Sequence, residues 1–255
     1  MVEERVHATL LEDGGLLHLV LDRPGGNILT RGLMEQLGHE LALRESDRHL
    51  RLVVIQGANG HFSYGASVDE HRKPSAPGML RALSRLVRAI ARSPAPVAAL
   101  VEGRCLGGGF ELALACHLIF TTPEAQLGCP EIKLGVFPPV LAALGPSRLG
   151  GALSDRLVLT GETLAGAEAK PWATVLSGSD PFAELVEWYR KGPARVSAAA
   201  LRIATHATRL GSEALLGARL DELENLYLDR VLSSHDGNEG IEAFLARRPP
   251  LWVDA

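Results

Sequence analysis

The sequence predicts an α/β fold of stacked strand–strand–helix (ββα) units, followed by a helical C-terminal region. Before residue 125 the chain twice repeats strand-like runs and a helical run, and from Ser154 onward helical spacing dominates. With 255 residues, of which 46% are hydrophobic, the chain can build one substantial core. We expect this core, with the functional site, over residues 1–175 and the helical region over residues 181–255.

The first unit opens with a predicted β-hairpin. Residues 7–12 and 16–21 read as strands, and the turn signal Asp-Gly-Gly lies between them. Thr30 is a suitable N-cap for a helix that runs to about residue 44 and carries its apolar side chains on one face. The apolar run over 52–55 then predicts a short buried strand.

The second unit repeats this order. Helical spacing over 77–91 ends before two prolines, which terminate a helix. The remaining expected elements are a strand over 97–101, a glycine-rich turn over 103–109, a helix over 110–116, a strand over 118–121, helices over 194–208 and 211–232, a break at 236–238 and a short last helix that ends at residue 248.

Composition excludes several classes of protein. The formal net charge of −4 does not predict the basic face that nucleic acids require. The three cysteines, Cys105, Cys116 and Cys129, form neither a disulfide framework nor a metal spacing, which favours a reducing compartment. The first residues lack the apolar stretch of a signal peptide, and no run is long enough to span a bilayer. We therefore expect a cytoplasmic protein without a metal, a nucleic-acid partner or a membrane partner.

The glycine triplet Gly107-Gly108-Gly109 lies between an expected strand and a helix. Glycines allow close approach of a ligand to the backbone, and the free N–H groups at a helix start favour an anion. Because the Lys-Ser/Thr of a phosphate loop is missing, an oxyanion matches better than a nucleotide. Taken alone, the triplet is better explained as a tight turn needed for packing.

A second loop, residues 62–70, follows the strand over 52–55 and contains the small pair Gly65-Ala66. We expect the amide of Ala66 to face that of Gly108, so that both donate to one thioester oxygen and stabilise an enolate. Removing one such donor raises a reaction barrier by about 3 kcal/mol. The loop alone is also compatible with an ordinary surface turn.

Two glutamates are candidates for acid–base chemistry. Glu111 lies near the start of an otherwise apolar helix, and Glu131 follows Pro130. Hydration of a double bond conjugated to a carbonyl needs one group that activates water and another that protonates the α-carbon. Two glutamates in different environments can divide these tasks. Taken singly, Glu111 is equally explained by a helix dipole and Glu131 by an ion pair with Lys133.

Taken together and in this order, the motifs resemble the crotonase, or enoyl-CoA hydratase, superfamily. The resemblance covers nearly the whole chain and is specific up to residue 150. It rests on the Arg23-Pro24…Asn27 turn, the loop over 62–70 with Ser67 where Asp is common, the segment 103–117 with His117 where Asp is frequent, the second glutamate motif over 130–135, and the C-terminal segment 239–252.

The resemblance implies a crotonase-like spiral of ββα repeats in which the Ala66 and Gly108 amides form an oxyanion hole. It implies that Glu131 exchanges the α-proton, while Glu111 holds and polarises the water or hydroxyl group. The implied reaction is reversible hydration of a 2-enoyl-CoA thioester without a cofactor, by a homotrimer or dimer of trimers with C-terminal helices at subunit contacts. The residues expected to border the coenzyme A or acyl moiety are Asn27, Ser67, Val68, Asp69, Gly107, Gly109, Phe137 and Pro138.

The acyl group is less well defined, since residues 136–140 depart from the small, glycine-rich pattern of the superfamily. Residues 65–71 together with 135–139 are similar to cyclic dienoyl-CoA hydratases and related branched acyl-CoA hydratases. The basic run His71-Arg72-Lys73 favours a second carboxylate, as in 3-methylglutaconyl-CoA, although a solvated surface run explains these residues better. We expect a branched dicarboxylic acyl group, with a cyclic dienoyl group as the alternative.

Two other functions stay open. Double-bond isomerisation would use the same enolate and one glutamate, and it would incorporate no solvent oxygen at the β-carbon. A non-catalytic scaffold or an RNA-binding relative is disfavoured by the net charge and by the intact pair of glutamates.

Overall fold

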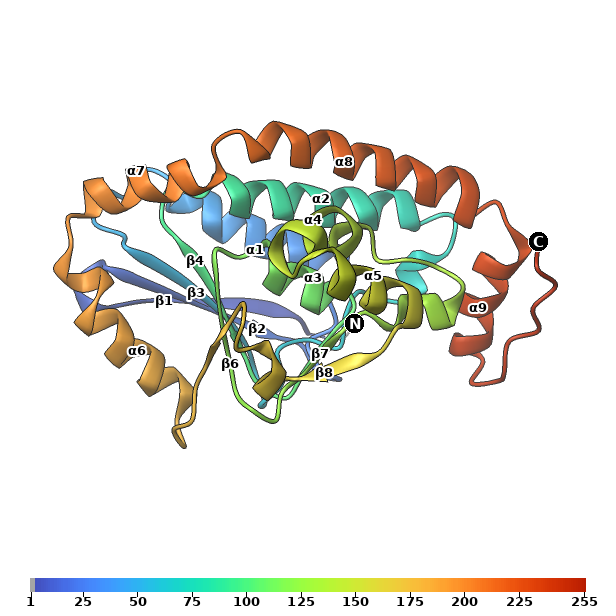
Figure 1. Cartoon of the computed structure of the whole chain (residues 1–255), viewed down its shortest axis with the longest axis horizontal. Helices are drawn as coiled ribbons and strands as arrows, with labels where there is room; N and C mark the ends of the chain where they lie inside the picture. Colours follow the sequence, from blue (N-terminus) through green and yellow to red (C-terminus); the bar gives the residue numbers. More distant parts are fainter. Residues whose placement is uncertain (1–2) are drawn as a thin grey trace.

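A computed structural model describes residues 3–255, and of residues 212–214 it describes the backbone alone. It confirms the expected α/β architecture with a helical C-terminal region (Figure 1). The main sheet has six strands in the order β1-β2-β3-β4-β6-β9, and only β1 runs antiparallel to its neighbour. These strands are β1 (Arg5–Leu11), β2 (Leu16–Asp22), β3 (Leu52–Gly57), β4 (Val97–Val101), β6 (Leu118–Thr121) and β9 (Thr174–Val175).

Both faces of the main sheet are covered, which explains its nearly continuous apolar strands. Successive side chains of a strand point to opposite faces. In β3, Val53 and Ile55 therefore join the core beneath the first three helices, while Leu52 and Val54 join a second core. That second core is closed by Tyr189 and its neighbours on α6 (Pro181–Lys191).

A smaller sheet of β5 (Arg104–Leu106), β7 (Gln126–Gly128) and β8 (Thr163–Ala165) completes the spiral of strands. The expectation that 103–109 is only a turn was therefore wrong in part, and the strands after residue 154 were missed. Each strand of this sheet has three residues, too few for alternation to show in the sequence. Two isolated parallel bridges extend this strand pairing to earlier residues. One joins Ser63 to Cys105 of β5, and the other joins Leu29 to Ala66.

The helices of the core agree closely with the sequence patterns. Thr30 caps the first helix as predicted, accepting a 3.1 Å hydrogen bond from the Leu33 amide. Within residues 3–255 no helix combines the length and apolar character that crossing a bilayer requires. The helices not yet given are α1 (Arg31–Leu43), α2 (Ala76–Arg92), α3 (Gly108–Ala115), α4 (Pro139–Arg148), α5 (Gly151–Thr160), α7 (Ala198–Arg209), α8 (Ser212–Leu226) and α9 (His235–Leu245).

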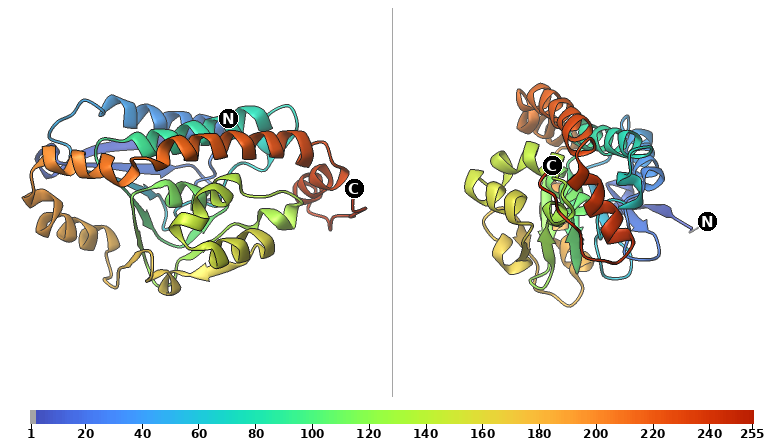
Figure 2. Two further views of the ribbon diagram at one scale, coloured as in Figure 1. Left: turned by 45° about the horizontal axis from the view of Figure 1, so that its top comes forward. Right: turned by 90° about the vertical axis from the view of Figure 1, so that its right-hand side faces the viewer.

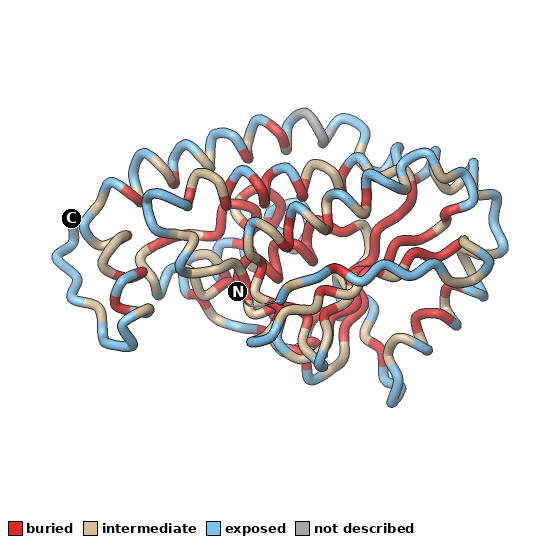
Figure 3. Tube along the Cα trace, turned by 180° about the vertical axis from the view of Figure 1, so that it is seen from behind, coloured by how far each residue is buried: buried red, intermediate tan, exposed pale blue. Residues whose placement is uncertain are grey.

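The C-terminal helices lie along one side of the molecule. Figure 2 shows α8 lying along α2, and α8 contacts both α2 and α4. Over residues 215–226 of α8 the buried positions, Gly217 and Leu220, alternate with exposed ones (Figure 3). Leu220 is buried in the core, whereas Leu215 is 63% exposed. The helix therefore covers the core and leaves Leu215 on its outer surface.

The structure corrects two details of the C-terminal region. Residues 236–238 do not separate two helices, because they form the first turn of α9, where the hydroxyl of Ser234 accepts a 3.0 Å hydrogen bond from the Gly237 amide. Asp, Gly and Asn are turn residues, but they are also tolerated in the first turn of a helix that has such a cap. In addition, α8 continues as a π-helical turn over Tyr227–Val231.

Candidate active site

Two loops that are distant in the sequence lie against each other at the start of α3. An added Cβ at Gly108 would lie 3.1 Å from the Ala66 nitrogen, and one at Gly65 would lie 2.9 Å from the Leu106 carbonyl oxygen. Only glycine fits these positions without displacing the backbone opposite. The contact brings the two predicted oxyanion-hole residues, Ala66 and Gly108, side by side.

The N–H groups of Ala66 and Gly108 are available to a ligand. Gly108 is the first residue of α3, so its N–H has no acceptor within the helix. The amides of Gly65 and Ser67 both have acceptors, whereas that of Ala66 has none in the part of the chain that the structure describes. Two adjacent free donors are the geometry that a developing oxyanion requires.

Glu111 is a buried carboxylate that α4 holds in place. Its residue is 2% exposed, and its Oε1 accepts hydrogen bonds of 2.6 Å from the Val140 amide and 3.0 Å from the Leu141 amide. These amides belong to the first turn of α4, where Pro139 has no N–H to offer. Glu111 thus complements the dipole of α4 in addition to its place in the first turn of α3.

Glu131 lies in the 3-10 turn Pro130–Leu134, opposite the glycine triplet. A Cβ on Gly107, whose φ is +51°, would lie 2.6 Å from Glu131 Oε1, so the carboxylate packs directly on this glycine. The residue as a whole is half-buried, but its Oε2 is buried and has no hydrogen-bond partner within residues 3–255. No ion pair joins it to the exposed Lys133 in that described range.

Burial raises the pKa of both carboxyl groups above the usual range near 4.5. For Glu131 the negative charge of Glu111 is a second cause that raises the pKa. For Glu111 the two α4 amides partly oppose the effect of burial. Ionising both groups at once is therefore unfavourable, and the pair is suited to share and transfer a proton near neutral pH.

A family model described as Enoyl-CoA hydratase/isomerase matches residues 12–255. The chain belongs to the enoyl-CoA hydratase/isomerase family. Cyclohexa-1,5-dienecarbonyl-CoA hydratase of Thauera aromatica is 39% identical over 244 residues, which cover 95% of either chain. Mitochondrial methylglutaconyl-CoA hydratase of Rattus norvegicus is 30% identical over 267 residues, covering 98% of this chain and 83% of the relative.

A solved structure confirms the crotonase fold. The crystal structure of an enoyl-CoA hydratase from Mycobacterium avium subsp. paratuberculosis K-10 superimposes with a TM-score of 0.83 at 29% identity and covers 98% of each chain. Membership of the enoyl-CoA hydratase/isomerase family confirms the resemblance found in the sequence. The protein is an enzyme with enoyl-CoA hydratase-type activity.

Asn27, predicted to border the substrate, has a clear structural role in this family member. It is 1% exposed, and its side-chain nitrogen donates to the carbonyls of Ala58 at 2.9 Å and His61 at 2.8 Å. Its Oδ1 accepts a 3.2 Å hydrogen bond from the Arg23 amide. These bonds tie the segment after β2 to the segment before the Ala66 loop.

Ser67, Val68 and Asp69 directly follow Ala66, and they have different surroundings. The Ser67 amide donates to the Leu29 carbonyl, and the half-buried Val68 packs on the core. Asp69 is exposed and pairs with Arg72 at 2.9 Å. Gly109, also predicted, packs against Ser63, where an added Cβ would lie 2.8 Å from the serine Cβ.

Phe137 and the buried Pro138 lie between Glu131 and α4, as the sequence places them. The Phe137 ring lies 5.5 Å, centroid to centroid, from the ring of Tyr227 in the π-helical turn. Tyr227 was missed, as were the Val140 and Leu141 amides that hold Glu111. The pair Pro138-Pro139 before an apolar run was a signal for the start of α4, but nothing in the sequence placed Tyr227 beside it.

We expect Asn27→Ala to lower the free energy of unfolding by about 2–3 kcal/mol, because it leaves buried carbonyls without donors. Asn59 is a matched control, since it is exposed and also has a positive φ, 60° against 54° for Asn27. Asn59→Ala carries the same backbone cost without those lost hydrogen bonds. Denaturant titration of both variants measures the difference, and equal losses would contradict the structural role of Asn27.

We expect Glu131→Gln to stabilise the free protein in a pH-dependent manner. Because the pKa of Glu131 is raised on folding, its stabilising contribution is complete below pH 4.5 and is lost as the pH rises through the raised value. Near pH 4 the variant should match wild type, and near pH 9 it should be more stable by at least about 1.4 kcal/mol, the equivalent of one pKa unit. Urea titrations across pH measure this, with Glu124→Gln as an exposed control. A constant difference across pH would contradict it.

Proposed function

We propose that the protein catalyses reversible hydration of a 2-enoyl-CoA thioester through an enolate, with no resident cofactor. The observation that supports this best is that two adjacent free amides accompany two buried carboxyl groups whose pKa is raised. The amides of Ala66 and Gly108 would stabilise negative charge on the thioester oxygen. The carboxyl groups would then supply and accept the protons.

In the hydration direction the ionised Glu111 accepts a proton from water as its oxygen bonds to the β-carbon. The electrons of the double bond move onto the thioester oxygen, and the protonated Glu131 delivers its proton to the α-carbon. The α4 amides suit Glu111 to this role, since they stabilise its ionised form. The charge of Glu111 in turn favours a protonated Glu131.

Isomerisation is the second candidate, because the family description includes it. An isomerase would move the double bond with one glutamate and would not add water. Both reactions share the enolate, so the pair of carboxyl groups favours hydration. Reaction in ¹⁸O-labelled water distinguishes the two, since only hydration places the label on the β-carbon.

For the acyl group we propose a cyclic dienoyl thioester. The relative from Thauera aromatica, named for such a substrate, is 39% identical to this chain. The half-buried ring of Phe137, which follows the Glu131 turn and contacts the ring of Tyr227, offers a flat surface against which a six-membered ring can pack. The branched dicarboxylic group that the sequence favoured remains unconfirmed.

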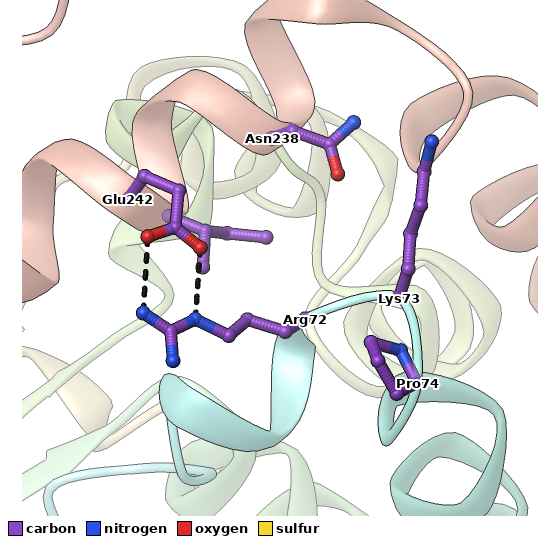
Figure 4. Close-up of a pocket in the computed structure, with 6 residues that line it drawn as sticks. Arg72, Lys73, Pro74, Asn238 and Glu242 are labelled. Carbon is purple, nitrogen blue, oxygen red and sulfur yellow. Dashed lines mark hydrogen bonds and ion pairs between the residues drawn. The ribbon is translucent and has the colours of Figure 1, made fainter.

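The residues that favoured a dicarboxylic substrate are engaged elsewhere. The Nδ1 of His71 lies 2.8 Å from the Ser67 carbonyl oxygen, and burial lowers the pKa of its ring, which favours the neutral form. Arg72 is exposed and forms two hydrogen bonds with Glu242 of α9 (Figure 4). Lys73 lines a cavity of about 220 Å³ with Arg72 and residues of α9, at the surface. None of the three is a free cation beside the glutamates.

We expect Glu111→Gln and Glu131→Gln each to lower kcat by about 10²- to 10⁴-fold, the usual contribution of general acid–base catalysis. Both variants should fold, because glutamine keeps the shape of the neutral acid. Loss of enoyl thioester absorbance measures the rate, and Glu124→Gln serves as the surface control. A wild-type rate in either variant would remove that glutamate from the mechanism.

We expect kcat/KM to be at least about 10-fold higher for cyclohexa-1,5-dienecarbonyl-CoA than for 3-methylglutaconyl-CoA or crotonyl-CoA, a typical selectivity of a fitted apolar pocket. Phe137→Leu should reduce this preference, because it removes one flat surface and keeps the apolar character. A higher kcat/KM for 3-methylglutaconyl-CoA would overturn the cyclic assignment.

We further propose that the helical region 181–255 mediates assembly into a trimer or a dimer of trimers. The helices α7 and α8 and the connection between them carry exposed apolar side chains, among them Ile203 and Leu210 at 71% and Leu215 at 63%. Exposed apolar groups of this size are typical of contact surfaces. Analytical ultracentrifugation should give three or six times the chain mass, and Leu215→Glu should reduce it. A monomer at micromolar concentration would contradict the proposal.

A further inference from the structure

Tyr227 carries a buried hydroxyl that lacks a hydrogen-bond partner among residues 3–255. The residue is only 1% exposed, so bulk water does not replace the missing partner. A buried polar group left in this state destabilises a fold by about 1–3 kcal/mol. Such groups are rare in proteins, and a catalytic role is one of the recognised explanations for them.

The surroundings of Tyr227 connect it to both halves of the proposed active site. Its ring lies 5.5 Å from that of Phe137, which follows the Glu131 turn. On another side it lies 6.3 Å from the ring of His71, which is bonded to the loop of Ala66 through the Ser67 carbonyl. Tyr227 therefore reaches from the C-terminal helix to the junction of the two catalytic loops.

The backbone at Tyr227 is also unusual. The residue opens the π-helical turn Tyr227–Val231 at the end of α8. A π-helical turn inserts a residue relative to an α-helix, redirects the side chains around it, and occurs frequently at functional sites. Here the π-helical turn begins at Tyr227, whose phenol is buried, whereas the outer face of α8 is exposed.

A second orphan atom belongs to the turn Pro130–Leu134, which leads into Phe137 beside this phenol. Glu131 Oε2 is a buried acceptor with no donor in the described part of the chain. The negative charges of Glu131 and then of Glu111 raise the pKa of Tyr227, after burial itself. The phenol consequently stays protonated as a donor. An orphan donor on Tyr227 and an orphan acceptor on Glu131, carried by segments that the Phe137–Tyr227 ring contact joins, match a small ligand with both functions.

We propose that Tyr227 is a further catalytic residue, whose hydroxyl donates a hydrogen bond to the water or β-hydroxyl oxygen that the two glutamates handle. This inference rests on the proposed hydratase function. A water molecule has two protons and two lone pairs. When its protons point to glutamate oxygens and Tyr227 occupies one lone pair, the remaining lone pair is directed at the β-carbon. Tyr227 thus orients the nucleophile, and in the reverse reaction it stabilises the departing oxygen.

Substitution of the hydroxyl alone tests this role. Tyr227→Phe should lower kcat for hydration by about 10- to 100-fold with little change in KM, because the lost bond acts on the reacting oxygen and not on the acyl-CoA. The same variant should melt at an equal or higher temperature, since an unsatisfied hydroxyl is removed. A purely structural tyrosine would show the opposite pattern, a lower melting temperature with a normal kcat. A stable variant with wild-type kcat overturns the proposal.

Tyr189→Phe is the matched control. Tyr189 is also buried, at 2% exposure, but it extends from α6 into the second core, on the other face of the main sheet. Its substitution removes the same atom and should leave kcat unchanged. An equal loss of kcat in both variants would mean a general effect on the core and would overturn a specific role for Tyr227.

A measurement that needs neither substitution of Tyr227 nor turnover provides the second test. The chain has three tyrosines, so incorporation of 3-fluorotyrosine gives three ¹⁹F resonances, assigned through Tyr189→Phe and Tyr64→Phe. The Tyr227 resonance should shift more with 3-hydroxybutanoyl-CoA than with butanoyl-CoA, which lacks the β-hydroxyl. Equal shifts overturn the proposal. A chain that hydrates no 2-enoyl-CoA would contradict the proposed function instead, and the ¹⁹F result would still decide whether Tyr227 binds the β-oxygen.

Discussion

The contact between Glu111 and the first turn of α4 is the interaction on which the site depends. A carboxylate buried in an apolar helix is unfavourable unless hydrogen bonds and a positive dipole compensate it. The amides of Val140 and Leu141 provide both. The same contact fixes the position of α4 relative to α3, and therefore the width of the space between Glu111 and the Glu131 turn. The need to stabilise the charge of Glu111 thus sets the distance between the two glutamates.

Sequence patterns predicted the parts of the fold that have long, regular periods. The hairpin of β1 and β2, the helices α1 and α2, and the buried strand β4 were all placed correctly. Their signals are local, because hydrophobic spacing and an N-cap such as Thr30 suffice. The smaller sheet could not be found in this way, since strands of three residues are defined by their partners and not by their own composition.

The site shows the same division between local and distant information. Glycines beside Glu111 and Ala66 mark their loops, so the candidate residues could be named from motifs. The contact between the two loops could not be predicted, because it depends on how the spiral stacks loops that are about 40 residues apart in the sequence. Asn27 illustrates the limit, since a motif position expected to meet substrate has a side chain occupied by three backbone groups. Tyr227 illustrates the converse, because no motif marks it.

The free enzyme carries an energetic disadvantage at the site of its chemistry. Glu131 holds a buried oxygen without a donor and Tyr227 a buried hydroxyl without an acceptor, within the described residues. Each destabilises the empty fold, and the continuous apolar core around the main sheet must offset both. A ligand that supplies a donor and an acceptor at once removes both penalties when it binds. In the proposed mechanism these polar groups are arranged for the reacting oxygen before it arrives, which is the condition under which preorganised groups accelerate a reaction.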